Sequence, residues 1–338
     1  MRLFQLLLSH VWLALVQATI NSTTINGLSY GRGNGDIRFH FDDAVVNGCS
    51  SVIMMGVGTS MSVEQYDKLA REIVQGKPIV FIMADTNPCY WKNAVKYCPA
   101  PDPLKNCHEK DYANFTELIA KQLTTMIHVC QGHQKKPRFF IGGHSASGQS
   151  ALGALGYLKF QPDGFIGLDP AEIDLEIFKI PLRVCPFNFA NGYQKLPVTL
   201  NIGFEREPCL VHPKESAAYA YEESDAASRV FIRIKTPPFT SIIHCSFADQ
   251  GCPLCPTPLW CIFCPLPWWC PVRPSWDWNE DQANLVRQVV TKAIHILVEG
   301  SVPANPADYQ DLSVIGLNFN VAVNNDSVSC QSTTRAGT

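Results

Sequence analysis

The sequence predicts an α/β fold in which a mostly parallel central sheet carries helices on both faces. One indication is a set of short runs that are apolar at every position, such as residues 51–55 and 78–83. A strand of a parallel sheet is buried on both faces, so runs of this kind are typical of such strands. A second indication is that segments with helical spacing separate the runs, which is the order that parallel strands require.

The first half of the chain gives strand, helix and strand in turn. Residues 51–55 predict a strand, and the turn-rich loop 56–62 leads into a helix at 63–74, where apolar side chains share one face. Residues 78–83 predict the next strand. The clearest amphipathic helix is expected at 111–130, and its apolar stripe consists of Phe115, Leu118, Ile119, Leu123, Met126 and Ile127.

The second half continues the alternation and ends in a helix. A strand at 138–141 runs into a glycine-rich turn, and a helix at 285–297 closes the domain. Beyond Gly300 we expect one further strand, at 313–321, with Cys330 as an anchor for the tail. Three short apolar runs predict the remaining strands, at 164–168, 198–202 and 230–234.

Composition sets the broad class of the protein. The chain has 338 residues, of which 46% are hydrophobic and 17% charged, so it can bury a sizeable core. Its formal net charge of −3 implies no basic face, which argues against nucleic acid as a partner. We expect one domain over residues 19–300, followed by a C-terminal extension over residues 301–338.

The first 18 residues predict a secretory signal peptide. Arg2 gives the positive start, an interrupted apolar run follows, and Ala18 ends a cleavage site of small residues. A membrane anchor is the alternative, but the run is short for a span. Fourteen cysteines indicate an oxidising compartment, namely the secretory pathway, with a secreted or endomembrane-lumen protein. Glycosylation sequons at Asn21, Asn114 and Asn325 point the same way.

Two insertions, at about 85–110 and 250–272, concentrate the cysteines and prolines. The first contains Cys89, Cys98 and Cys107. The second contains two Cys-x-x-Cys pairs, whose separation is shorter than zinc sites usually have, so we expect disulfides rather than a metal. It also carries many aromatic residues and no charge. Inward packing is one interpretation, but a short loop cannot easily bury all of these rings, so we expect an exposed surface for lipid, substrate or a partner. Its candidate substrate-binding residues are Trp260, Phe263, Trp268 and Trp269.

The strongest motif is Gly-Gly-His-Ser-Ala-Ser-Gly at 142–148, between the strand at 138–141 and a segment of small residues. A serine at a tight strand-to-helix corner is the nucleophile of the α/β-hydrolase fold, so the motif predicts Ser145 as that nucleophile. The usual fifth residue is glycine, whereas here Ser147 precedes Gly148. The amide of Ala146, at the start of the helix, is expected to bind the oxyanion.

A serine nucleophile needs a histidine base. Of the nine histidines, His212, His244 and His295 follow the motif and its neighbour His144. His212 comes too early, before the last expected strand, and His295 lies in the closing helix. His244 follows the strand at 230–234, where this fold delivers its base, so we predict His244.

The orienting acid has two candidates. Asp169 ends a strand in the run Gly-Leu-Asp-Pro, and the carboxyl end of a strand is where site residues gather. Glu207 follows the next strand and is the alternative, although it neighbours Arg206 and resembles a surface charge. We favour Asp169.

The second oxyanion donor is expected from the loop 56–59, and we predict the amide of Val57. Gly56 in this loop and His144 beside the nucleophile are further candidates for contact with substrate.

These motifs resemble those of chlorophyllases. The similarity lies in the Gly-His-Ser-x-x-Gly turn, the Ile-Gly-Leu-Asp-Pro strand end, and His244 followed by Asp249 and a Cys-x-x-Cys segment, and it covers roughly residues 51–300. Platelet-activating-factor acetylhydrolases and cutinase-like esterases share much of this plan. The sequence departs from chlorophyllases at Met55-Gly56, in both cysteine-rich insertions, and in its secretory leader.

The resemblance implies hydrolysis of the phytyl ester of chlorophyll by Ser145, Asp169 and His244. A secreted lipase or cutinase-like esterase is the alternative, and a non-catalytic binding protein with the same fold is the second. The esterases need no metal or organic cofactor. We expect a hydrophobic ester as substrate, peripheral contact with a membrane or lipid surface, and no nucleic acid. A signal-led algal route to the plastid is an alternative destination.

Overall fold

The structure is a computed structural model, and its description covers most of the chain. The described residues are 20–29, 34–45, 48–58, 61–85, 107–126, 136–170, 196–205, 217–235, 244–250, 279–300, 304–309, 312–314, 316–324 and 326–330.

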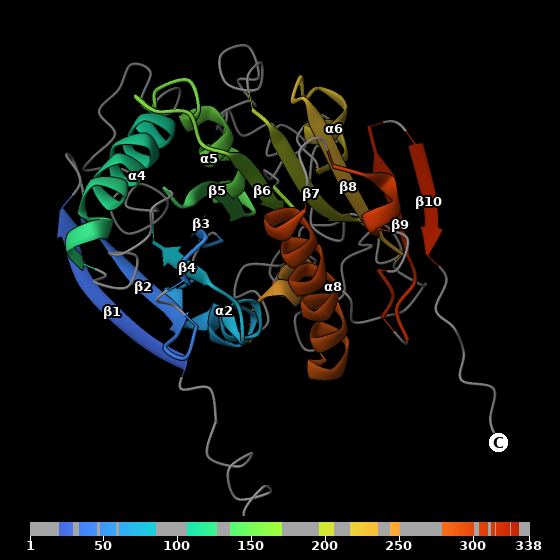
Figure 1. Cartoon of the computed structure of the whole chain (residues 1–338), viewed down its shortest axis with the longest axis horizontal. Helices are drawn as coiled ribbons and strands as arrows, with labels where there is room; N and C mark the ends of the chain where they lie inside the picture. The colour runs from blue at the N-terminus through green and yellow to red at the C-terminus, as the bar shows by residue number, and fades with distance from the viewer. Residues whose placement is uncertain are drawn as a thin grey trace, which may run out of the picture.

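A sheet of ten strands forms the centre of the molecule, in the order β1-β2-β4-β3-β5-β6-β7-β8-β9-β10 (Figure 1). The strands from β3 to β8 are mutually parallel. The outer strands pair antiparallel at both edges. The strands are β1 (Ile20–Ser29), β2 (Asn34–Asp42), β3 (Ser51–Gly56), β4 (Ile79–Ala84), β5 (Arg138–His144), β6 (Gly164–Leu168), β7 (Val198–Phe204), β8 (Ser228–Ile234), β9 (Phe319–Val323) and β10 (Asp326–Cys330).

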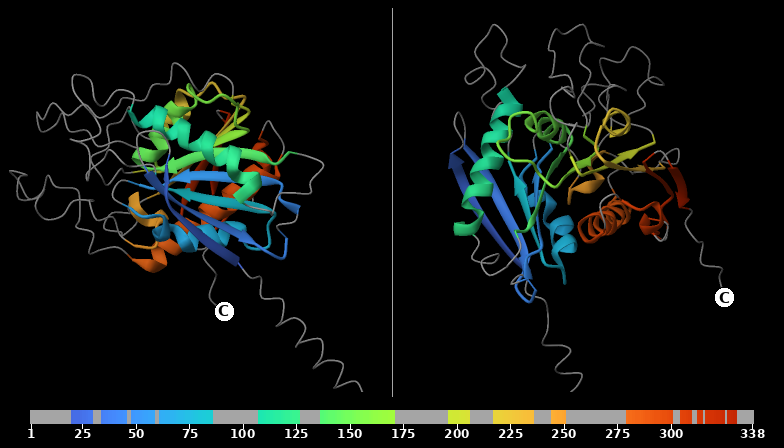
Figure 2. Two further views of the ribbon diagram at one scale, coloured as in Figure 1. Left: turned by 90° about the vertical axis from the view of Figure 1, so that its left-hand side faces the viewer. Right: turned by 45° about the horizontal axis from the view of Figure 1, so that its top comes forward.

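Helices cover both faces of this sheet (Figures 1 and 2). The helices are η2 (Val63–Tyr66), α2 (Asp67–Val74), α4 (Cys107–Met126), α5 (Ala146–Ala154), α6 (Ala217–Glu222), η8 (His244–Phe247), α8 (Glu280–Glu299) and η10 (Pro306–Tyr309). The helices α2 and α8 pack on one face, while α4, α5 and α6 pack on the other. Within the described part of the chain, no helix is both long and apolar enough to cross a membrane.

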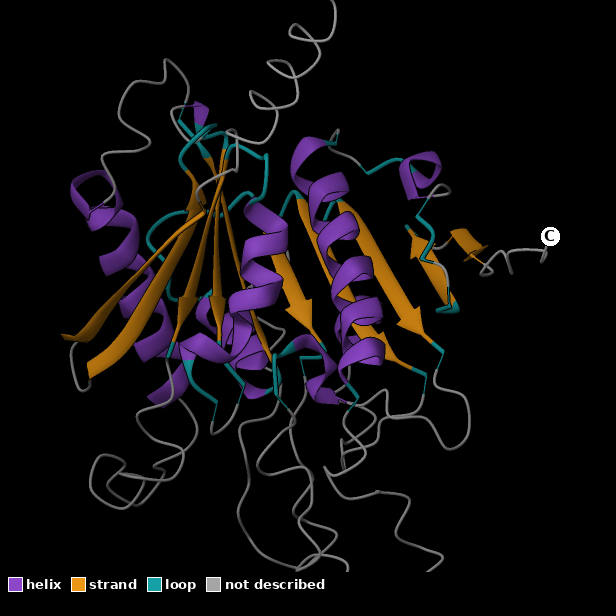
Figure 3. Ribbon diagram, turned by 90° about the horizontal axis from the view of Figure 1, so that it is seen from below, coloured by secondary structure: helices purple, strands orange, loops and turns teal. Residues whose placement is uncertain are grey.

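This arrangement is the α/β-hydrolase fold, and it confirms the predicted fold class. Parallel strands β3 to β8 follow an antiparallel β2, and the crossover that places β4 before β3 gives the order of that fold. Seen from below, the parallel strands end together at one edge of the sheet, which is where this fold assembles its site (Figure 3).

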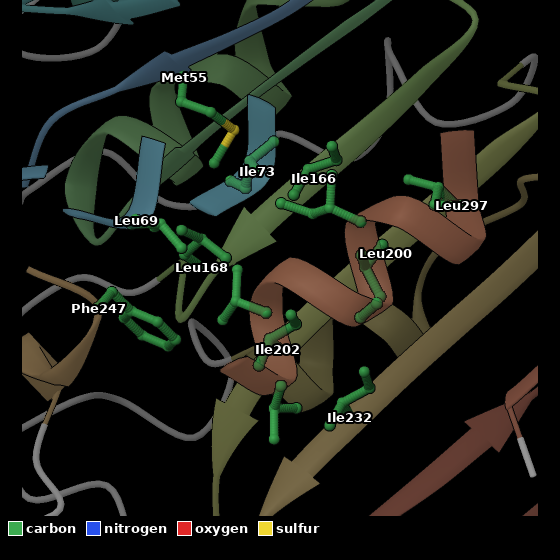
Figure 4. Packing of buried hydrophobic residues seen from close by; sticks show 14 of the residues in the cluster. Met55, Leu69, Ile73, Ile166, Leu168, Leu200, Ile202, Ile232, Phe247 and Leu297 are labelled. Carbon is green, nitrogen blue, oxygen red and sulfur yellow. The ribbon is translucent and has the colours of Figure 1, made fainter. Parts of the chain in front are cut away.

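The core lies in two layers, one on each side of the sheet. Successive side chains of a strand point to opposite faces, so Ile53 and Met55 face α2 and α8 while Val52 and Met54 face α4 and α5. Figure 4 shows the first layer, where side chains from β6, β7 and β8 meet those of α2 and α8. The apolar runs in the sequence therefore mark strands that are covered on both faces.

The structure adds to the predicted elements and corrects some of them. The sequence does not predict the edge strand β1 or its neighbour β2. The helix expected at 111–130 runs over Cys107–Met126, so the end of the first insertion is helical. The tail strand begins at Phe319 rather than at residue 313, because Gly316 turns the chain with a φ of 92°, and β10 adds a further strand. The predicted signal peptide and most of both insertions, with their disulfides, lie outside the described residues.

Candidate active site

Ser145 sits at the corner between β5 and α5, as the motif predicts. Its backbone has a φ of 56° and a ψ of −134°, a strained conformation for a residue other than glycine. The corner is tight because Gly143 and Gly148 touch. A Cβ on Gly143 would lie 2.7 Å from the Gly148 nitrogen, and a Cβ on Gly148 would lie 2.7 Å from the Gly143 oxygen. The two glycines therefore allow the turn that exposes the serine.

The unusual Ser147 is accommodated by Gly56. Ser147 is buried, and a Cβ built on Gly56 would approach the Ser147 Cβ to 2.6 Å and a Tyr112 ring carbon to 2.9 Å. A serine fits at this position of the motif because Gly56, the last residue of β3, has no side chain. Gly56 is buried against these residues, so its role is close packing rather than the predicted contact with substrate.

Asp169 and His244, predicted as acid and base, are in contact. Asp169 directly follows β6 and has a φ of 43°, and its Oδ2 lies 2.6 Å from His244 Nδ1. Both side chains are buried. The two residues are 75 positions apart in the sequence, and the parallel topology brings them together because β6 and β8 end at the same edge. The alternative acid, Glu207, lies outside the described residues.

The two predicted oxyanion donors differ in their surroundings. Ala146 is the first residue of α5, and the first amides of a helix have no partner within it. The Val57 amide instead donates to the Ala84 carbonyl at 3.0 Å, so the loop's first amide extends the pairing with β4. The prediction for Val57 is therefore wrong in this structure. The next amide, that of Gly58, donates to the Tyr66 hydroxyl at 2.9 Å.

His144 is buried between Tyr66 and His244, and its ring bonds to both of them. Its ring is buried, with Nδ1 2.6 Å from the Tyr66 hydroxyl and Nε2 3.0 Å from the His244 carbonyl. Both ring nitrogens are thus occupied by protein, which contradicts its predicted contact with substrate. Burial lowers the pKa of His144 well below its ordinary value, so the ring is neutral.

Sequence reasoning missed Tyr66. It occupies one of the apolar positions of the segment 63–74, so the pattern counted it as an ordinary core residue. Its hydroxyl is buried with it, and burial raises the pKa of Tyr66, which keeps the hydroxyl protonated. A buried tyrosine usually finds a hydrogen-bond partner, but the sequence does not show which one.

Among the described residues, no group of three or more histidine, cysteine, aspartate or glutamate side chains could hold a metal ion. The four aromatic residues predicted to contact substrate, Trp260, Phe263, Trp268 and Trp269, lie outside the described residues.

Comparisons with known proteins add the following. No protein-family model matches the chain, and no curated protein matches its sequence. Among solved structures, it is similar to carboxyl esterase 2 from the mycorrhizal fungus Tuber melanosporum, with 13% identity over 69% of this chain and 80% of that chain and a TM-score of 0.42. It is also similar to dienelactone hydrolase from Anabaena variabilis, with 12% identity over 64% and 86% and a TM-score of 0.40. Likenesses this slight do not indicate a reaction.

Proposed function

We propose that this protein is a serine hydrolase that cleaves carboxylic esters. The observation that carries the proposal is the 2.6 Å hydrogen bond between buried Asp169 and His244, at the same sheet edge as the strained corner of Ser145. A turn of this kind without chemistry would not need a carboxylate and an imidazole paired beside it. The chain order of serine, acid and histidine is also that of α/β-hydrolases.

In the proposed reaction, His244 Nε2 takes the proton of the Ser145 hydroxyl while Oγ attacks the ester carbonyl carbon. The Ala146 amide stabilises the oxyanion that develops. The imidazolium then gives its proton to the departing alkoxide, and an acyl-enzyme remains on Ser145. Water, deprotonated by His244, then attacks the acyl carbon. The bond from that carbon to Ser145 Oγ breaks, the imidazolium returns its proton to Oγ, and the acid leaves. Asp169 fixes the tautomer in which Nδ1 carries the hydrogen, and it balances the charge of the imidazolium.

The nucleophile is tested by Ser145→Ala. This change removes the attacking oxygen and should lower kcat about 10⁴-fold or more, because triad members act as a unit. Labelling by a fluorophosphonate probe should disappear with it. Ser150→Ala is the matched control, since Ser150 lies in α5 and its hydroxyl donates to the Ala146 carbonyl. A Ser145→Ala protein that stays active and labelled would refute the proposal and would place the nucleophile at another residue.

The acid is tested by comparing Asp169→Asn with Glu207→Gln. Loss of the carboxylate leaves His244 without its orienting partner, so Asp169→Asn should lower kcat about 10³- to 10⁴-fold. Glu207→Gln should change it little. The opposite result would assign the acid to the segment after β7.

The substrate class is the finer part of the proposal. The resemblance to chlorophyllases and the uncharged aromatic insertion favour a bulky hydrophobic ester, with chlorophyll as first choice and lipid or polyester as second. The aromatic rings would then meet the substrate or a lipid surface. Rates on chlorophyll, emulsified triglyceride, a short acyl ester and a polyester film would separate these substrates. Activity confined to the short ester would contradict a bulky substrate.

A further inference from the structure

We propose that Tyr66 and His144 form a hydrogen-bond relay that positions His244 and couples it to the loop after β3. The relay runs from the Gly58 amide through the Tyr66 hydroxyl and the His144 ring to the His244 carbonyl. Tyr66 and His144 are positioning residues in this proposal, since they act through His244. The inference rests on the proposed function, because it assigns His244 as the base.

The direction of every bond in the relay is fixed by elimination. The His244 carbonyl can only accept, so His144 Nε2 carries the ring's hydrogen. A neutral imidazole has one N–H, which leaves Nδ1 as an acceptor. The Tyr66 hydroxyl must therefore donate to Nδ1, and its oxygen accepts from the Gly58 amide. This assignment satisfies all three bonds at once.

The surroundings of the relay maintain this assignment. Tyr66 and His144 are both buried, and burial disfavours a tyrosinate and an imidazolium alike. The Met61 sulfur lies 3.1 Å from the Tyr66 hydroxyl, but a thioether is a weaker acceptor than an imidazole nitrogen. The rings of His144 and His244 stand 4.5 Å apart between centroids, with an interplanar angle of 35°. A neutral His144 adds no charge repulsion when His244 becomes an imidazolium.

Close packing links the loop to the same ring. A Cβ on Gly58 would lie 2.6 Å from His144 Nδ1, so the loop backbone rests directly on the imidazole. A shift of the loop after β3 therefore moves His144, and with it the carbonyl of His244. The position of the loop after β3 and the position of His244 are therefore coupled through His144.

A second buried tyrosine supplies the matched control. Tyr112 of α4 is as buried as Tyr66, and its ring packs against Gly56 at the end of β3. Its hydroxyl donates to the Gly142 carbonyl of β5 rather than to a histidine. Tyr66→Phe and Tyr112→Phe thus remove the same group at equal burial, but only Tyr66→Phe interrupts the path to His244.

The experiment compares kcat, KM and the proton resonance of His244 Nδ1–H in these two variants. Tyr66→Phe should lower kcat about tenfold to a hundredfold, as expected for a displaced catalytic group, with little change in KM. The downfield signal of the Nδ1 hydrogen, which lies in the 2.6 Å bond to Asp169, should shift or broaden. Tyr112→Phe should lose comparable stability yet keep kcat and the signal.

Variants of His144 give a second test. A glutamine side chain can still donate to the His244 carbonyl, so His144→Gln should retain more activity than His144→Phe, which can make neither bond. If His144→Phe fails to fold, the comparison of His144→Gln with Tyr66→Phe decides instead, since both keep part of the relay.

The outcomes separate this inference from the proposed function. If Ser145→Ala removes activity but Tyr66→Phe leaves kcat and the His244 signal unchanged, or Tyr112→Phe lowers both equally, the relay is wrong and the hydrolase stands. If Ser145→Ala remains active, the proposed function fails. The His244 signal still decides then whether Tyr66 positions that ring, because it needs no turnover.

Discussion

The segment 244–250, which carries His244, is held on two sides by different kinds of interaction. On the side of β5, the contact is neutral and buried: His144 donates to the His244 carbonyl. On the side of α2 and α8, the contacts involve charged side chains. Arg287 of α8 donates to the Ala248 carbonyl at 2.8 Å, and the Asp249 carboxylate accepts from the Lys68 amide of α2 at 3.0 Å.

The charged side extends towards solvent. The Arg287 side chain is buried, and it also donates to Glu280 Oε1 at 2.6 Å. Glu280 in turn accepts from Lys68 Nζ at 2.7 Å. Burial acts to raise the pKa of Glu280, but the hydrogen bonds from Lys68 and Arg287 outweigh it and lower that pKa. The network is therefore anchored in the core at one end and hydrated at the other.

The two sides differ in what they do: one holds the segment 244–250 in place, and the other orients His244. A guanidinium offers five donors in a fork, so Arg287 can hold the segment through several arrangements. The neutral imidazole of His144 has a single N–H and a single acceptor nitrogen, so only one arrangement of its two hydrogen bonds is possible. The charged side should therefore govern stability, and the neutral side should govern the placement of His244.

The largest effect on stability is expected from Arg287→Met. Methionine fills similar space but leaves the Ala248 carbonyl without the Arg287 donor and removes one of the donors to Glu280. The free energy of unfolding should fall by about 2–4 kcal/mol, as when one partner of a buried pair is removed. Denaturant titration measures this change. Tyr66→Phe should lower the stability less than Arg287→Met does, and it should lower kcat more. An Arg287→Met protein as stable as the wild type would contradict the assignment of stability to the charged side.

A smaller effect is expected when the pH falls below about 6.5. Burial lowers the pKa of His144 well below its ordinary value and that of His40 to about 4. The unfolded chain takes up these protons first. The stability that the two neutral histidines contribute is therefore fully present above the pKa of histidine in the unfolded chain. It is lost as the pH falls below that value, by up to about 1.4 kcal/mol per pH unit for each histidine.

The measurement is the free energy of unfolding between pH 7 and pH 5 for the wild type, His144→Gln and His40→Gln. Each variant should show a shallower fall than the wild type. Burial raises the pKa of Asp249 and of Glu72, which works in the opposite direction at lower pH, so variants are compared with the wild type at each pH. A His144→Gln slope equal to that of the wild type would mean that the ring is not kept neutral.

The parts of the fold that the sequence predicted are those with a local signature. Strands such as β3 and β4 are apolar at every position because both faces are covered, and Ser145 lies in a motif whose small residues the turn requires. The edge strand β1 has no such signature. Most of its side chains, over Ile20–Ser29, are polar or small. The strand pairs with β2 through its backbone at the edge of the sheet.

The parts of the site that the sequence did not predict depend on contacts between distant residues. His144 is 78 positions from Tyr66 and 100 from His244, and no local pattern in the sequence shows that these residues meet. The pair of Asp169 and His244 is just as distant in sequence, but known chain order and strand ends made it predictable. Val57 was misassigned because a glycine-rich loop does not reveal which of its amides the neighbouring strand has already bound.

The smallest effect is expected at the hydrated end of the charged network, in the ion pair of Lys68 with Glu280. The Lys68 side chain is 51% exposed and that of Glu280 is 36% exposed, so water screens their attraction. Lys68→Met leaves the backbone amide that Asp249 accepts from, and it should lower the free energy of unfolding by no more than about 1 kcal/mol. The loss should shrink between about 0.05 M and about 1 M salt, since mobile ions screen exposed charges.

The matched control for Lys68→Met is Lys77→Met, which breaks the exposed pair with Glu299 at the other end of α8. Both changes remove one surface ion pair of α8, but only Lys68 adjoins the segment that carries His244. If the two variants lose equal stability and both keep the wild-type kcat, the ion pair of Lys68 with Glu280 is an ordinary surface contact. A loss for Lys68→Met that clearly exceeds the control and persists at high salt would mean that the charged side holds the segment through its hydrated end as well, and that its anchorage is not confined to Arg287.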